Sequence, residues 1–151
     1  MHLTARADYA LRACAEIAAA NPGPTKAERV AQLQNIPLKF IENILATLKH
    51  AGIVRSQRGV DGGYWLARPA EEITLAEVIR AVEGPLANVR GERPESTQYR
   101  GPAKPLREVW VAVRASLRIV LEDVTLADLV KGRLPASVAR LTRDKEAWVG
   151  H

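Results

Sequence analysis

The chain has 151 residues, of which 47% are hydrophobic and 26% charged, and its formal net charge is +5. These proportions exclude wholesale disorder, and no apolar run approaches the roughly 20 residues that a membrane-spanning helix requires. The N-terminus lacks the layout of a signal peptide, and a single cysteine, Cys14, can form neither an internal disulfide nor a multi-thiolate metal site. We expect a cytoplasmic protein whose positive charge permits a polyanionic partner without identifying one.

Three helices are predicted in the first fifty residues. Apolar residues recur at helical spacing over residues 5–20, and Thr4 is a suitable N-cap. Thr25 and Glu28 form a capping-box pattern that opens a second helix. Pro37 suits the first turn of a third helix, after only a short turn. This arrangement indicates a helix-turn-helix.

The third predicted helix has one apolar and one polar face. Its apolar stripe consists of Phe40, Ile41, Ile44, Leu45, Leu48 and Ala51, and its opposite face of Lys39, Glu42, Asn43, Ala46, Lys49 and His50. A recognition helix reads base edges with its outward N-terminal residues. Lys39 can donate to guanine, Glu42 can accept from cytosine, and Asn43 can pair with adenine. The alternative is that these are ordinary solvated positions of an amphipathic helix.

Two short strands are predicted next, over residues 53–57 and 63–67, and residues 58–62 form a glycine-rich connector. At the tip of this hairpin, Arg58 can enter a narrow minor groove, and glycines let backbone N–H groups approach phosphates. A plain glycine-rich turn is the alternative. A basic hairpin directly after a helix-turn-helix favours DNA binding.

The second half of the chain is expected to contain a long helix. Thr74 and Glu77 form a capping box for a helix that ends near Gly84, and residues 86–103 are expected to be irregular. From residue 104 to 124 the pattern is helical, with a coiled-coil seam made by Leu106, Trp110, Val113, Leu117 and Val120. A second apolar line, Val109, Ala112 and Ile119, lies beside that seam, so one face can dock on its own domain while the other meets a partner.

Several motifs together resemble the Rrf2 family of winged-helix transcription factors. They are Leu3-Thr4, Asp8-Tyr9-Ala10-Leu11-Arg12, Phe40-Ile41-Glu42-Asn43-Ile44-Leu45, Leu48-Lys49, Ala51-Gly52-Ile53-Val54, Arg58-Gly59-Val60-Asp61-Gly62-Gly63-Tyr64-Trp65-Leu66-Ala67, Ile73-Thr74-Leu75, Val78-Ile79, Glu83-Gly84-Pro85 and Val124-Thr125-Leu126-Ala127-Asp128-Leu129. The resemblance covers residues 1–132, and the wing is its most specific part.

The resemblance implies a homodimer in which the long helix crosses between subunits and each winged domain reads half of a palindrome. It places Glu42 at the position of a site-discriminating glutamate, and Arg58 and Gly59 at the minor-groove positions of the wing. The full set of expected DNA-contacting residues is Lys26, Leu38, Lys39, Glu42, Asn43, Arg55, Arg58, Gly59, Gly62, Gly63 and Tyr64.

The chain departs from the cluster-binding members of that family in residues 86–105. Those members carry three cysteines there, and this chain has none. Since thiolates are the usual ligands of iron–sulfur clusters, we expect neither a cluster nor any other cofactor. Asp8 matches an aspartate ligand of the nitric-oxide-sensing branch, but an acid favoured by the helix dipole explains it more simply. The histidines lack metal-ligand spacing, and no nucleophilic triad is present, so we expect no enzyme.

The predicted fold is mostly α-helical with a small β-hairpin wing. We expect a winged helix-turn-helix domain over residues 1–83, an irregular sensor-type loop over 84–103, a dimerisation helix and following turn over 104–132, and a tail over 133–151 without assigned structure. The expected function is a DNA-binding repressor. The alternatives are a winged-helix module that binds protein, and a regulator that senses a small organic ligand or a partner protein through residues 86–103.

Overall fold

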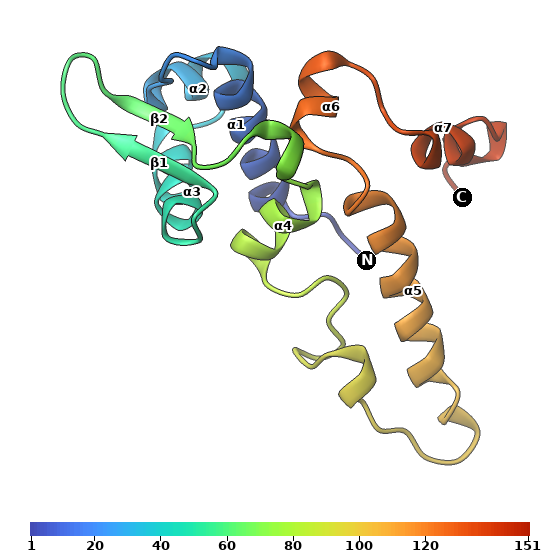
Figure 1. Cartoon of the computed structure of the whole chain (residues 1–151). Helices are drawn as coiled ribbons and strands as arrows, with labels where there is room; N and C mark the ends of the chain where they lie inside the picture. Colours follow the sequence, from blue (N-terminus) through green and yellow to red (C-terminus); the bar gives the residue numbers. More distant parts are fainter.

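The computed structural model describes all 151 residues and confirms the predicted fold class (Figure 1). Its helices are α1 (Ala5–Ala20), α2 (Ala27–Gln34), α3 (Leu38–His50), α4 (Leu75–Glu83), α5 (Leu106–Leu121), α6 (Leu126–Lys131) and α7 (Ala136–Thr142), and its two strands are β1 (Val54–Gln57) and β2 (Gly63–Leu66). The strands pair antiparallel, with Val54 opposite Leu66 and Gln57 opposite Gly63. No helix combines the length and apolar character needed to cross a membrane.

The helices α1–α4, the hairpin and α6 share one core and are called the reading domain from here on. Helix α1 lies at its centre, between α3, α4 and α6. The hydroxyl of Thr4 caps it by accepting a hydrogen bond from the backbone N–H of Ala7 at 3.1 Å, as predicted. Its buried face is built mostly from small side chains: Ala7, Ala10, Ala13, Cys14, Ile17 and Ala18. Because alanines occupy so little volume, the helices around α1 can pack closely against it.

The predicted capping box at the start of α2 is wrong. Helix α2 begins one residue later, with Lys26 as N-cap and no side-chain cap. Thr25 instead exchanges two backbone hydrogen bonds with Tyr64 of β2, at 3.0 and 2.9 Å. The wing therefore gains a third, one-residue strand from the segment before α2. This pairing holds Thr25 outside the helix, and its hydroxyl oxygen is buried without a hydrogen-bond partner.

Helix α3 follows α2 after a tight turn, in which Asn35 adopts the left-handed conformation with φ of 52°. Its buried residues are Ile41, Ile44, Leu45 and Leu48. Two members of the predicted apolar stripe do not belong to it, because Phe40 is 59% exposed and Ala51 is exposed. Phe40 lies at the side of the helix, where its ring makes an edge contact with Tyr9 of α1.

Helix α5 extends away from the reading domain, and the chain then returns to it (Figure 1). The capping box of α4, formed by Thr74 and Glu77, is present as predicted. Residues 84–105 form the irregular connection to α5, with short 3-10 turns at Pro94–Ser96 and Gly101–Ala103. No residue of α5 itself is fully buried.

The segment after α5 packs into the core of the reading domain. The N–H of Leu75 donates to the carbonyl of Val124 at 3.0 Å, and the N–H of Leu126 donates to that of Ile73 at 2.9 Å. The side chain of Leu126 is completely buried in the main apolar cluster. The expected division between residues 1–83 and residues 104–132 therefore separates segments that share one core. The tail, to which no structure was assigned, forms α7 and a 3-10 turn at Lys145–Trp148.

The burial of Leu126 predicts a large loss of stability in the variant Leu126→Ala. Replacing a fully buried leucine by alanine removes apolar contacts and leaves a cavity, which costs about 2–5 kcal/mol. Chemical denaturation followed by circular dichroism measures this change. Leu134→Ala is the matched control, because Leu134 is 50% exposed. Equal stability of the two variants would contradict the placement of α6 in the core.

Candidate nucleic-acid interface

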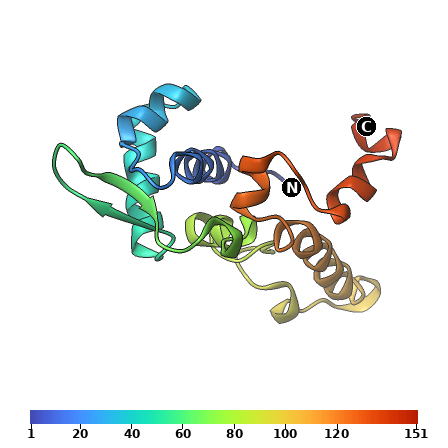
Figure 2. The same cartoon turned by 45° about the horizontal axis from the view of Figure 1, so that its top comes forward.

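The wing and α3 lie on the same side of the molecule, far from α5 (Figure 2). Lys39 and Glu42 are exposed in the first half of α3, and neither forms a hydrogen bond or ion pair with another side chain. Leu38, at the start of the helix, is 36% exposed. Unpaired polar groups at the N-terminal end of an exposed helix are free to bind base edges.

Asn43 is also exposed, but its amide oxygen already has a partner. The guanidinium of Arg6 donates to this oxygen at 2.7 Å, to the hydroxyl of Thr47 at 2.9 Å and to the carbonyl of Val82 at 3.1 Å. Arg6 therefore joins α1, α3 and the end of α4. Its role was missed from the sequence, because no short-range pattern connects residue 6 with residues 43, 47 and 82. The predicted contact of Asn43 with adenine remains a prediction.

The wing tip carries one free cation. Arg58 is exposed and forms no ion pair, and Val60 beside it is 91% exposed. Lys26, at the start of α2, donates its ammonium N–H to the carbonyl of Gly59 at 3.2 Å. Two predicted DNA-contacting cations, Lys26 and Arg58, are thus brought together with Gly59 at one end of the hairpin.

The glycines at the base of the tip serve the packing of the wing on its own chain. A Cβ atom on Gly62 would lie 2.2 Å from the carbonyl oxygen of Gln57, so no other residue fits this turn. A Cβ on Gly63 would lie 3.0 Å from the carbonyl oxygen of Thr25. Gly62 is buried and Tyr64 is half-buried against the core, which leaves Gly59 as the open glycine of the tip.

Arg55 lies over the indole ring of Trp65, 4.7 Å from the ring centre. The indole N–H donates to the carbonyl of Pro22 at 3.1 Å, so the stack is anchored to the turn between α1 and α2. Cation–π contacts of this kind fix the direction of a guanidinium. Arg55 is therefore exposed but oriented, whereas Arg58 is exposed and free.

The predicted dimer seam faces mainly toward its own chain. Its members are Leu106, Trp110, Val113, Leu117 and Val120, and all except Leu106 are half-buried. The indole N–H of Trp110 donates to the hydroxyl of Tyr99 at 2.9 Å. Val113 and Leu117 line cavities shared with Met1 and residues 84–90. The second apolar line is the open one, since Val109 is 48% and Ile119 57% exposed.

Comparisons of this sequence with known proteins all point to the same family. The sequence model of the Rrf2 family, described as an iron-dependent transcriptional regulator, matches residues 3–132. A Mycobacterium tuberculosis (strain H37Rv) protein named among the HTH-type transcriptional regulators is 46% identical over 97% of this chain and 92% of its own length. CymR of Bacillus subtilis is 35% identical over 85% of this chain and 89% of its own length.

The residues of this chain do not fit an iron or iron–sulfur site, although the family description names iron dependence. Residues 86–103 contain neither cysteine nor histidine. Cys14 is fully buried, and burial raises the pKa of its thiol to about 12, which disfavours the thiolate that binds metal. Asp8 is paired with Arg12 at 3.1 Å. Nowhere do three side chains of histidine, cysteine, aspartate or glutamate gather as metal ligands.

Solved structures agree with the sequence comparison. CymR, the global cysteine regulator of B. subtilis, superposes with a TM-score of 0.74 and 32% identity over 87% of this chain and 98% of its own. IscR of T. potens superposes with a TM-score of 0.71 and 29% identity, over 87% and 88% of the two chains. The matched family and these neighbours are transcriptional regulators, not enzymes. This chain belongs to the Rrf2 family of winged helix-turn-helix transcriptional regulators.

Proposed function

We propose that this DNA-binding regulator is a repressor that occupies palindromic promoter sites as a homodimer, without an iron–sulfur cluster. One observation carries the proposal: α3, with the unpaired polar side chains of Lys39 and Glu42, and the wing, with the unpaired Arg58 at its tip, lie on the same side of the molecule. Such an arrangement lets α3 enter a major groove while Arg58 reaches the neighbouring minor groove. A dimer bound across a promoter represses simply by excluding other proteins.

In this proposal Lys39 and Glu42 read base edges, and the remaining cations position the protein on the backbone. Glu42 is the informative residue, because a carboxylate close to phosphates is unfavourable unless it accepts a hydrogen bond, as from the amino group of cytosine. Lys26, Lys49, Arg55 and Arg58 supply the compensating positive charge. Phosphate contacts fix the position of the protein, and base contacts select the sequence.

The open face of α5 supports the homodimer. Val109 and Ile119 are exposed apolar residues, and the small residues Ala112 and Ser116 lie between them on the same side of the helix. Small side chains let a second helix approach closely, and exposed apolar stripes of this kind mark interfaces. A second copy of α5 is the partner that a twofold-symmetric regulator supplies. The two α3 helices of the dimer must then lie about 34 Å apart.

The basic test is selection of bound fragments from random DNA, followed by transcription in vitro from a promoter that carries the selected motif. The proposal expects a palindromic motif and a loss of transcript as protein is added. A motif without symmetry, or activation of transcription, would contradict the corresponding part of it.

Glu42→Ala is expected to change the selected motif more than it changes affinity for random DNA. A side-chain contact to a base contributes about 1–3 kcal/mol of discrimination, and random DNA does not depend on it. The measurement is a repeat of the selection with the variant. Glu146→Ala, in the C-terminal tail, removes the same charge far from the wing and should leave the motif unchanged. An unaltered motif with Glu42→Ala would show that this residue does not read bases.

Arg58→Ala should weaken operator binding and lower the slope of log K against log salt by about one unit, as expected for one lost contact with the phosphate region. Stability should stay nearly constant, since Arg58 has no partner in the chain. Gel-shift titrations at several salt concentrations give the slope. Arg140→Ala, on α7, is the control for net charge. Equal effects of the two variants would mean that only overall charge matters.

Val109→Glu is expected to convert a dimer into a monomer, because it places a charge in the proposed interface between α5 helices. Light scattering at micromolar concentration measures the mass, and operator affinity should fall with it. Val60→Glu, at the 91% exposed wing tip, makes the same substitution outside the interface and should remain dimeric. The dimer proposal fails for a parent protein that is itself monomeric under these conditions.

A further inference from the structure

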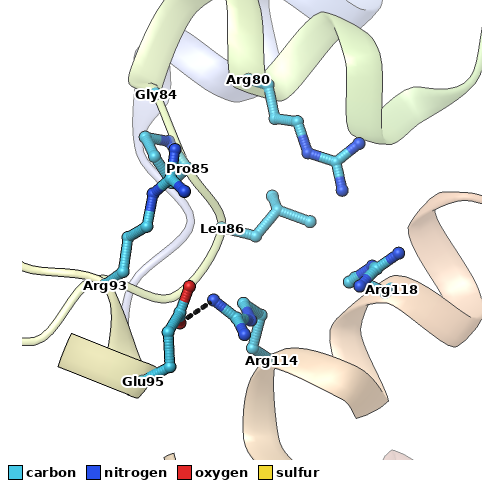
Figure 3. A pocket seen from close by; sticks show the side chains of 8 residues that line it. All are labelled: Arg80, Gly84, Pro85, Leu86, Arg93, Glu95, Arg114 and Arg118. Atoms are coloured by element: carbon cyan, nitrogen blue, oxygen red, sulfur yellow. Dashed lines mark hydrogen bonds and ion pairs between the residues drawn. The ribbon is translucent and has the colours of Figure 1, made fainter. Parts of the chain in front are cut away.

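A cavity of about 450 Å³ lies where the reading domain meets α5 (Figure 3). Its walls come from the last turn of α4, from the loop after it and from the middle of α5. Four arginines line it, namely Arg80 of α4, Arg93 of the loop, and Arg114 and Arg118 of α5. Figure 3 shows the side chains of Arg80, Arg114 and Arg118 around a space that has Leu86 at its floor.

The chain supplies too few carboxylates to neutralise these arginines. Glu95, also in the wall, pairs with Arg114, and Glu122 pairs with both Arg80 and Arg118. A hydrogen bond from its own backbone N–H, together with Arg114, holds the pKa of Glu95 below its usual value. Hydrogen bonds from Arg80 and Arg118 do the same for the pKa of Glu122. With both glutamates ionised, two positive charges remain uncompensated.

Arg93 is the clearest sign of an unfilled site. Its guanidinium forms neither an ion pair nor a hydrogen bond within the chain, although it lies close enough to Glu95 to influence that carboxylate. Arg114 is the least accessible of the paired arginines, with a side chain only 23% exposed. Clustered guanidiniums repel one another, and the repulsion is relieved by an anion that several of them share.

We propose that this cavity binds a small metabolite with two negative charges, and that the bound anion sets the angle between α5 and the reading domain. The proposal deepens the proposed function and rests on it for the regulatory step. In this proposal the anion lies in the cavity that Arg93 of the loop and Arg118 of α5 line from opposite sides (Figure 3), and planar guanidiniums can hold a carboxylate, phosphate or sulfate group through paired hydrogen bonds. Leu86 then contacts the rest of the ligand.

The position of the cavity would let a bound ligand affect both the reading domain and α5. Leu86 is buried in a small apolar cluster with Ala7 of α1 and with Ala76 and Ile79 of α4. The ligand therefore touches a residue that packs on the reading domain and, at the same time, two arginines of the proposed dimer helix. Because Arg114 and Arg118 stand one turn apart, on a different side of α5 from Val109 and Ile119, the cavity stays open in the proposed dimer.

The binding test uses the full-length protein and calorimetry at constant ionic strength. The probes are succinate, inorganic phosphate, sulfate and glycerol 3-phosphate, with acetate as the singly charged comparison. At least one doubly charged probe should bind with one site per chain and raise the melting temperature, while acetate does neither. The strongest probe shows whether the natural ligand carries carboxylates, a phosphate or a sulfate group.

Variants separate a built site from general attraction of anions. Arg93→Gln should weaken binding of the strongest probe by about tenfold, since it removes charged hydrogen bonds without breaking any contact within the chain. Arg107→Gln, an exposed arginine of α5 outside the cavity, should bind like the parent. Glu95→Gln should bind several-fold more tightly, because it removes a competing negative charge and releases Arg114. Equal binding by all three variants, or dissociation of the dimer in Arg93→Gln, overturns the proposal; the second result would assign the cavity to an acidic side chain of the partner copy.

The regulatory step is tested by operator affinity with and without a saturating amount of the strongest probe. A ligand that sets the angle of α5 must change this affinity at least fivefold, and Arg93→Gln must abolish the change. Unchanged affinity despite calorimetric binding rejects the regulatory step alone. Absence of operator binding under any condition rejects the proposed function, and calorimetry still decides whether the cavity binds anions.

Discussion

The close packing around α1 is the constraint on which the other parts of the molecule depend. Ala10, Ala13 and Cys14 have no exposed surface, and their small side chains let α3, α4 and α6 lie against one helix. Arg6 adds a polar link from the same helix to α3 and to the end of α4. The orientation of α3, and with it the direction of Lys39 and Glu42, is therefore set by its packing on α1. The same packing positions α4 and the loop that follows it.

This packing ties the chain to the reading domain both before and after α5. Soon after α4 ends and well before α5 begins, the chain passes through Leu86, which is buried against α1 and α4. After α5, Val124 and Leu126 form backbone hydrogen bonds with Leu75, the first residue of α4, and with Ile73 just before it. The ion pair between Arg80 and Glu122 adds a third link beside the cavity. Because packed elements transmit strain, a change in the angle of α5 would reach α4 through these links.

The sequence predicted features that depend on neighbours in the chain. The bounds of α1, the capping box of Thr74 and Glu77 and the position of the hairpin all follow from short-range patterns, and the structure contains them. The predictions were wrong where a residue contacts a segment that lies far away in the sequence. Thr25 has the residue type of an N-cap, but Tyr64, 39 positions later, holds it in a bridge. Phe40 is apolar and follows the helical spacing, but it lies beside the buried stripe, where its ring stays 59% exposed and contacts Tyr9 of α1.

The same distinction explains the two lines on α5. A heptad pattern shows that a helix has an apolar face. It does not show which surface covers that face, because the same spacing of apolar residues serves a partner helix and a segment of the same chain equally well. Trp110, Val113 and Leu117 are covered by the N-terminal residues and the loop of their own chain. The proposed dimer contact is therefore assigned to the weaker line with Val109 and Ile119, which stays exposed. The spacing between Arg114 and Arg118 can be read from the sequence. That Arg80 and Arg93 line the same cavity is evident only from the folded structure.

Placement of charge, more than its total, distinguishes the surfaces of this molecule. Arg6, Arg12 and Arg55 are engaged by their own chain, so they contribute to its shape and only partly to its attraction for DNA. Lys39 and Arg58 are free and lie on the face with α3 and the wing. At the junction with α5 the arginines outnumber the carboxylates that face them. The loop between α4 and α5 holds thiolates in the cluster-binding relatives that the sequence resembles. In this chain the loop carries Arg93 instead of thiolates, and Arg93 lines the cavity together with Arg80 of α4 and Arg114 and Arg118 of α5. If the proposed anion site is correct, an electrostatic contact takes the place of iron ligation between the reading domain and α5.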